Sequence, residues 1–371
     1  MKKAAYIIIL VFFATSYVFP KEEVKIGAIF GKTGEVSIWD MRYIETLRLA
    51  VQEINAGSGL LNRQIKLIEF DNKSSALGAK IAAKNAVKEG VIGVIGADYS
   101  SHSLAIAPIL QKAKIPMISN YSTAEEVTLV GDFIFRVCYT DSFQGFLMAN
   151  FAYKDLKAKK AVILTNANST YSIGLSRVFK NQFCHIGGQI LWSGDYLDTA
   201  TDFKNIIIKF KTLNPDIVFL PGYVRDSAFI IKQTRKMGCS VVFLGADGWS
   251  DDQYKYAGES IDGSYYCTHW HFDSPNKISR KLIQMFKKKY NKEFNDPGIA
   301  LVYDAIYLLV DAIKRANSFD TTKIRDSIAA TKNFIGATGK ITMDKNGDPK
   351  KSAVILQFNN GKSKFIKNID I

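Results

Sequence analysis

The stretch IGVIGADYSSHSLAIAPILQKAKIPMISNYSTAEEVT, residues 92–128, contains the pattern that decides the fold. The apolar run at 91–95 predicts a buried strand, which is followed by a polar loop with Ser100 and then a helix. A second short strand, 116–119, ends in another hydroxyl-rich loop that contains Thr123. Small molecules bind at the carboxyl ends of parallel strands, where helix N-termini offer backbone N–H groups. We therefore expect this stretch to form half of a site for a small anion, such as a carboxylate.

The same alternation of strands and helices continues along most of the chain. Apolar runs of strand type recur at 24–30, 64–70, 133–137, 161–164, 217–220 and 241–244. Helical patterns occur at 39–56, 75–88, 173–183, 226–237, 277–292 and 298–316. Towards the C-terminus, an Asn346-Gly347 turn between strand patterns at 339–343 and 352–358 predicts a hairpin. The series predicts an α/β protein with doubly wound parallel sheets, and the length of 371 residues suggests two domains.

The first residues have the character of an export signal. Lys2 and Lys3 precede an apolar run at 4–14, which is too short to span a bilayer, so we predict a signal peptide over 1–20 and a periplasmic location. The formal net charge is +14, but the basic residues are scattered and are not interleaved with aromatic ones. We therefore expect a solvated basic surface and no nucleic-acid partner.

The cysteines offer little support for redox catalysis or a structural metal. The four cysteines lie outside any CxxC pair, which argues against redox catalysis and structural zinc: Cys138, Cys184, Cys239 and Cys267. In an oxidising compartment they could form up to two disulfides in any of three connectivities, or remain as buried thiols.

Three other motifs resemble functional sites only in part. The loop GAIFGKT at 27–33 is one residue short of a phosphate-binding loop. His269 and His271 alternate on an extended segment without a third metal ligand nearby. Ser101 and His102 are adjacent in sequence, a spacing that seldom gives the geometry of a nucleophile and its base. We therefore predict no catalytic residue, no metal and no cofactor.

Polar side chains follow several of the predicted strands in both halves of the chain. Ser100 and Thr123 follow two strands of the first half, and Tyr171, Tyr223 and Asp247 follow three strands of the second. The hydroxyl groups can donate hydrogen bonds to a carboxylate, and the aspartate can pair with an ammonium group. The set therefore suits a zwitterion.

Several fragments stand in a characteristic order and spacing: GAIFGKTGEVSIWD, DNKSSALGAKIAAKNAV, IGADYSSHS, PMISNYSTAEEVT, TYSIG, LPGYVRD, LGADGWSDD, DGSYY and GKITMDKNGD. Through them the chain, from Val24 to about Phe358, resembles the periplasmic solute-binding proteins of branched-chain amino acid ABC transporters. The resemblance implies the type I periplasmic binding-protein fold, with two parallel-sheet lobes joined by a three-crossing hinge. Residues 23–137 and 271–338 would form the first lobe, and 138–270 and 339–371 the second.

The resemblance also assigns roles to individual residues. It implies ligand contacts from Ser100, the backbone of Tyr121, Thr123, Tyr171, Tyr223 and Asp247. It places the ligand's side chain among Trp39, Asp98 and Tyr99. Asp247 stands where the family usually has a glutamate, and Asp98 is unexpected for a purely aliphatic ligand.

The resulting expectation is a non-enzymatic, monomeric receptor that captures an amino acid and delivers it to a membrane ABC permease. The alternative is a sensory component that binds an amide or an aromatic acid and presents it to a chemoreceptor. An enzyme is the third possibility, and it is disfavoured because the sequence offers no nucleophile, metal set or cofactor loop.

Overall fold

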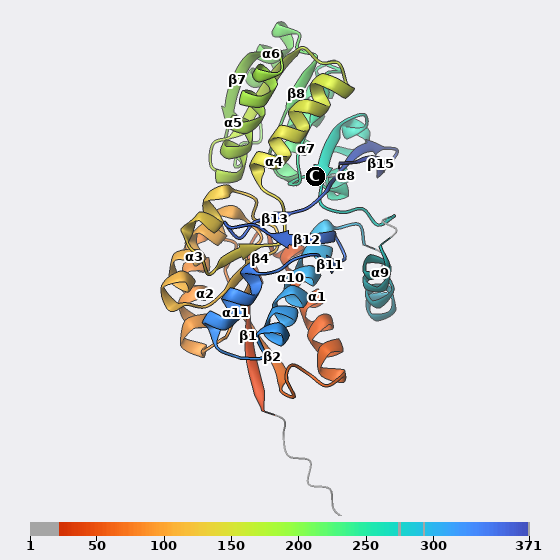
Figure 1. Cartoon of the computed structure of the whole chain (residues 1–371). Helices are drawn as coiled ribbons and strands as arrows, with labels where there is room; N and C mark the ends of the chain where they lie inside the picture. Colours follow the sequence, from red (N-terminus) through yellow and green to blue (C-terminus); the bar gives the residue numbers. More distant parts are fainter. Residues whose placement is uncertain (1–21, 274–275, 292–293, 370–371) are drawn as a thin grey trace, which may run out of the picture.

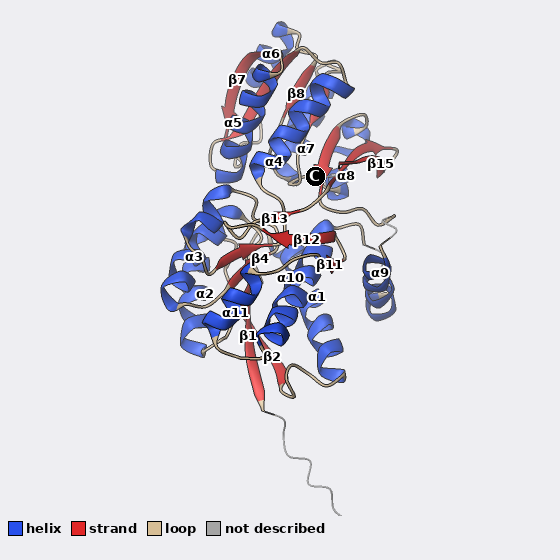
Figure 2. Cartoon of the chain, in the orientation of Figure 1, coloured by secondary structure: helices blue, strands red, loops and turns tan. Residues whose placement is uncertain are grey.

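The computed structural model describes residues 22–273, 276–291 and 294–369, so the predicted signal peptide over 1–20 lies outside the described residues. The described chain forms two α/β lobes stacked end to end (Figure 1). Helices cover the sheets in both of them (Figure 2). None of the helices among these residues combines the length and apolar character that a membrane span requires.

The first lobe is built on a five-stranded parallel sheet of order β2-β1-β3-β4-β5. Its strands are β1 (Glu23–Phe30), β2 (Gln64–Asp71), β3 (Val94–Gly96), β4 (Met117–Ser119) and β5 (Ile134–Arg136). Its helices are α1 (Ser37–Ala56), α2 (Ala76–Glu89), α3 (Ser100–Ala113), η1 (Glu125–Val130), α9 (Lys277–Tyr290), α10 (Pro297–Ala316) and α11 (Thr321–Ala329). The strands and helices predicted for this half are thereby confirmed, with ends shifted by a few residues.

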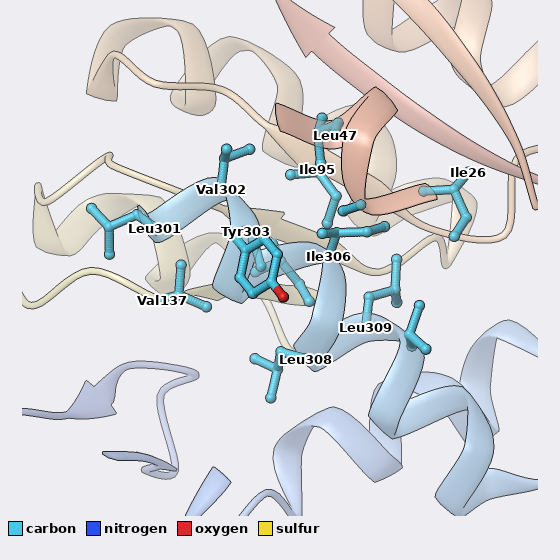
Figure 3. Close-up of a cluster of buried hydrophobic side chains, with 14 of the residues drawn as sticks. Ile26, Leu47, Ile95, Val137, Leu301, Val302, Tyr303, Ile306, Leu308 and Leu309 are labelled. Carbon is cyan, nitrogen blue, oxygen red and sulfur yellow. The ribbon is translucent and has the colours of Figure 1, made fainter. Parts of the chain in front are cut away.

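Helix α10 shows how a late segment completes the first lobe. The Asp296 side chain accepts a hydrogen bond from the Gly298 amide and caps the helix, and Pro297 takes the first turn, where a missing N–H is tolerated. The helix is apolar on nearly all sides and packs in the core against the sheet, where its Ile306 lies near Ile26 of β1 (Figure 3). This core therefore joins segments far apart in sequence.

The second lobe is built on a seven-stranded sheet of order β15-β14-β10-β9-β8-β6-β7. Its strands are β6 (Lys160–Asn166), β7 (Gln189–Tyr196), β8 (Ile217–Phe219), β9 (Val242–Leu244), β10 (Tyr265–Thr268), β14 (Ala353–Asn359) and β15 (Lys362–Ile369). Its helices are α4 (Asp141–Asn150), η2 (Phe151–Asp155), α5 (Thr170–His185), α6 (Lys204–Leu213), α7 (Val224–Lys236), η3 (Asp251–Gln253), α8 (Tyr254–Ala257) and η4 (Gly258–Ile261). Strands β6 to β10 are parallel, whereas β14 and β15 pair antiparallel at one edge.

The predicted C-terminal hairpin is wrong in one of its strands. The turn at Gly347 is present, with φ of +80°, and it joins β12 (Gly339–Met343) to the two-residue strand β13 (Pro349–Lys350). β12 also pairs with β11 (Phe334–Gly336), which completes a separate three-stranded sheet. The strand predicted to close the hairpin is β14, which instead pairs with β10 in the second lobe. The hairpin strand β13 is only two residues long, and after it the chain crosses to the second lobe, where β14 pairs antiparallel with β10.

The chain crosses between the lobes after β5, after β10 and after β13, which gives the three crossings expected of this fold. The buried Lys351 ties two of them together, because its Nζ donates to the carbonyl oxygen of Val137 (3.1 Å) and to Oγ1 of Thr338 (2.5 Å). Burial lowers the pKa of Lys351 to about 8. The residue boundaries proposed for the two lobes stay a prediction. Ile341 and Met343 lie beyond the proposed boundary at residue 338, yet they pack in the hydrophobic core of the first lobe.

Candidate functional site

A cavity of about 370 Å³ lies between the two lobes. Its lining contains all nine residues singled out in the sequence: Trp39, Asp98, Tyr99, Ser100, Tyr121, Thr123, Tyr171, Tyr223 and Asp247. They come from α1 and the loops after β3 and β4 in the first lobe, and from segments after β6, β8 and β9 in the second. The strand-end rule had singled out Ser100, Thr123, Tyr171, Tyr223 and Asp247, and the family resemblance had implied the other four.

The first-lobe wall presents a helix N-terminus and hydroxyl groups. Helix α3 begins at Ser100, and the preceding Tyr99 supplies no side-chain cap to its first turn. The His102 amide donates to the Tyr99 carbonyl oxygen (3.0 Å), so the amides of Ser100 and Ser101 are the ones that keep their capacity to bind an anion, which the helix dipole also favours. Ser100 Oγ accepts a hydrogen bond from the Ala124 amide (3.3 Å), so the loops after β3 and β4 are held together. Thr123 is 1% exposed in the second of these loops.

A buried arginine fixes the loop after β4. Arg136 donates to the carbonyl oxygens of Ser122 (2.7 Å) and Ala124 (2.8 Å), on either side of Thr123. Its Nε lies 2.6 Å from the Asp348 carboxylate, which balances its charge. Such charge-assisted contacts are stronger than neutral hydrogen bonds. Arg136 therefore positions the loop that carries Tyr121 and Thr123, a role the sequence did not indicate.

The second-lobe wall contains two stacked phenol rings. The rings of Tyr171 and Tyr223 stack with centroids 5.3 Å apart, and the Tyr171 hydroxyl accepts a hydrogen bond from the Gly248 amide (3.0 Å). Burial raises the pKa of both phenols well above the usual value, so they remain protonated donors at neutral pH. The Gly248 contact orients Tyr171 toward the loop that carries Asp247.

Asp247 has a buried partner that sequence analysis missed. His269 Nε2 lies 2.8 Å from Asp247 Oδ2, and the His269 ring stacks on Tyr139 with centroids 3.6 Å apart. Burial lowers the pKa of His269 to about 4, so the imidazole is neutral at pH 7 and leaves the negative charge of Asp247 uncancelled. In the tautomer with its proton on Nε2, the ring donates to the carboxylate and holds it in place.

The signal that could have found His269 is its position. It follows β10, the strand beside β9, and the strand-end rule applied to Asp247 places it at the same edge of the sheet. It had been considered only as a possible metal partner of His271. The His271 ring instead lies next to Phe272 and, at 3.5 Å, the Asp273 carboxylate. No group of three or more metal-ligating side chains occurs in the described parts of the chain.

The two walls touch each other directly. The Tyr121 hydroxyl donates to the carbonyl oxygen of Asp247 (2.9 Å), and the ring centroids of Tyr99 and Tyr223 are 4.7 Å apart. At the rim, the Trp39 indole N–H donates to the Asp252 carboxylate (2.8 Å), which engages the predicted pocket residue Trp39 across the cleft.

Charged pairs add to these contacts at the rim. Arg42 lies 3.3 Å from the Asp252 carboxylate, and Arg225 lies 3.2 Å from that of Glu35. The structure is therefore a closed form, with one cavity shared by both walls.

The remaining sequence motifs have structural roles. Lys32 and Thr33 in the glycine-containing loop donate to Glu69 and Asp71. Burial lowers the pKa of His102 to about 4, and its Nδ1 lies 3.5 Å from the Asn72 side chain. Within the described residues the four cysteines are all free thiols. The loop at 27–33 thus uses its polar groups to join β1 to β2.

Two α/β lobes that close over one cavity, with polar groups from both walls, define a two-lobe solute-binding protein. The chain belongs to the periplasmic binding protein family, whose model matches residues 23–363.

Several relatives of the chain are named after the amino acids that they bind. A leucine-, isoleucine-, valine-, threonine- and alanine-binding protein of Pseudomonas aeruginosa is 26% identical over 338 residues, which are 90% of this chain and 89% of that protein. The structure of a leucine binding protein from Thermotoga maritima is 38% identical, with a TM-score of 0.89, and the match covers 94% of this chain and 99% of that one. A branched-chain amino acid transporter substrate binding protein from Streptococcus pneumoniae, solved with isoleucine, is 29% identical, with a TM-score of 0.86 and coverage of 93% and 99%.

Proposed function

We propose that this protein is a periplasmic receptor that captures one amino acid between its lobes and delivers it to a membrane ABC permease. The observation that carries the proposal is the cavity between the lobes, which has anion-binding groups on one wall and the Asp247 carboxylate on the other. The names of the relatives, with coverage near the full chain, support the amino-acid class.

Each end of the amino acid would find complementary groups. The α-carboxylate binds Ser100, Thr123 and the first amides of α3, where hydroxyl and N–H donors meet the positive end of the helix dipole. The α-ammonium binds Asp247, which His269 holds in position. The phenols of the second lobe complete the donor set around the carboxylate.

Closure is coupled to binding because the ligand contacts both walls. A ligand shifts the equilibrium between open and closed forms only by its difference in affinity for them, and the open form offers half of these contacts. The hinge closure brings Tyr121 onto the Asp247 carbonyl group and the rim residues onto each other. The closed form is then the one that a permease would recognise.

We further propose that the protein acts as a monomer, without a catalytic step, after export directed by residues 1–20. The experiment that tests the function is a thermal-shift screen of the purified mature protein against the twenty amino acids, small amides and aromatic acids, followed by calorimetry. A bound ligand raises the melting temperature by mass action. We expect at least one amino acid to bind; binding confined to amides or aromatic acids would contradict the proposal and favour the sensory alternative.

A further inference from the structure

The cavity is acidic although the protein is basic. Six carboxyl groups line it: Glu35, Asp98, Asp198, Asp226, Asp247 and Asp296. Among the lining residues that the structure describes, the single lysine or arginine is Arg225, and it is paired with Glu35. The whole chain carries a formal net charge of +14. A cavity lined by carboxyl groups, with its arginine already paired, favours a ligand that brings positive charge.

Two of the deeply placed carboxyl groups have partners within the protein. Asp226 accepts a hydrogen bond from the Tyr196 hydroxyl (2.5 Å). Asp296 lies 3.3 Å from Arg42 and accepts from the Gly298 amide (2.9 Å). Asp226 and Asp296 therefore have polar partners within the protein. Asp247 would gain a charged partner through the proposed contact with the α-ammonium group of the ligand.

Asp98 is different, because the groups that act on it are three other carboxyl groups and the Asn120 amide, and none of them is cationic. It follows β3, lines the cavity and is 8% exposed. Its Oδ1 is fully buried and finds no hydrogen-bond partner among the described residues. Burial and the nearby carboxyl groups of Asp40, Asp296 and Asp247 raise the pKa of Asp98 well above the usual range. A buried carboxyl group without a partner is unfavourable unless something that binds in the site supplies one.

We propose that the cavity selects a dibasic amino acid, with Asp98 binding the cationic group at the end of the ligand's side chain. This inference rests on the proposed function, because it takes the α-carboxylate and α-ammonium groups to be held as described above. The methylene stem of such a side chain would pack on Trp39 and Tyr99, whose rings line the same cavity. An aliphatic ligand such as leucine would instead leave Asp98 buried without a cationic partner.

The experiment compares ligands that differ only in the terminal charge. Calorimetry measures the affinity of the mature protein for lysine against norleucine and for ornithine against norvaline, with leucine as a reference. We expect at least one dibasic member to bind ten-fold or more tightly than its uncharged partner. In Asp98→Leu this preference should be lost or reversed, whereas Asp132→Asn, which changes an exposed carboxyl group outside the cavity lining, should retain it.

The possible outcomes separate this inference from the function on which it rests. If norleucine or leucine binds the wild-type protein as tightly as lysine and ornithine, the dibasic assignment is overturned while the amino-acid receptor stands. Tighter binding of glutamine than of either dibasic ligand also overturns it, because a neutral donor would then be preferred. If no amino acid binds, both proposals fail. If Asp98→Leu is too unstable to be assayed, the dibasic assignment is tested by two other measurements: the ligand pairs with the wild-type protein, and the same pairs with Asp98→Asn.

Discussion

Replacing Asp247 by asparagine tests the proposed ammonium contact with little disturbance of the fold. The Asp247→Asn side chain has the same size, and its carbonyl oxygen can still accept the hydrogen bond from neutral His269. The variant loses the negative charge, which is the part of the group that attracts an ammonium ion. We therefore expect a loss of affinity with only a small change in the melting temperature of the ligand-free protein.

The magnitude follows from burial. The Asp247 side chain is 3% exposed, so solvent screens its interaction with the ligand weakly. Removing one partner of such a buried, hydrogen-bonded charge pair costs about 2–5 kcal/mol. Since each 1.4 kcal/mol is about a ten-fold change, the dissociation constant should rise by about 30-fold to several thousand-fold.

Calorimetry with the amino acid that emerges from the ligand screen measures the effect. Asp226→Asn is the matched control, because Asp226 is also a buried carboxyl group of the second-lobe wall but is engaged by Tyr196. We expect the control to bind within about three-fold of the wild type. If Asp247→Asn also binds within that margin, the ammonium assignment is refuted.

Three further predictions concern closure and stability. Tyr121→Phe removes one hydrogen bond across the cleft, worth about 0.5–1.5 kcal/mol, so calorimetry should show affinity about 2- to 12-fold weaker; unchanged affinity would mean that the contact does not favour closure. Burial raises the pKa of Asp40 from 3.8 to about 8, so ionising it destabilises the fold as pH rises across that interval. In urea unfolding, the free energy of unfolding of the wild type should fall with pH by up to about 1.4 kcal/mol per pH unit more than that of Asp40→Asn. Parallel pH profiles for the two proteins would contradict this prediction. Arg136→Met removes a fully buried guanidinium group and leaves the partly buried Asp348 without its cationic partner, so it should reduce the free energy of unfolding by about 3–5 kcal/mol in the same assay, with a loss below 1 kcal/mol as the contrary result.

The sequence was most informative where a local pattern coincides with a rule of topology. Ser100, Thr123, Tyr171, Tyr223 and Asp247 each follow a strand of a parallel sheet, and such strand ends meet at one edge. Each residue needs only its own strand to be identified, so the residues of each wall could be predicted from the strand-end rule, whereas the expectation that the two walls face each other came from the family resemblance. The polar walls of the cavity were therefore available from one sequence.

Features that depend on distant segments could not be obtained in the same way. His269 reaches Asp247 only because β10 lies beside β9, and Asp296 reaches the cavity because the chain re-enters the first lobe before α10. Helix α4 was not anticipated: its start is set by Thr140, which accepts from the Phe143 amide, while Gly145 weakens the helical pattern. Likewise, the Asn346-Gly347 turn indicates a hairpin but does not reveal that its second strand ends at Lys350.

The contacts of Lys351 influence how the two lobes can move relative to each other. One ammonium group links the crossing that leaves β5, at Val137, to the segment around Thr338 and to its own crossing strand. Two of the three connecting strands are thus linked at a common point, which favours bending together over sliding past each other. A swing about that point would return the same two walls to the same register at every cycle of capture and release.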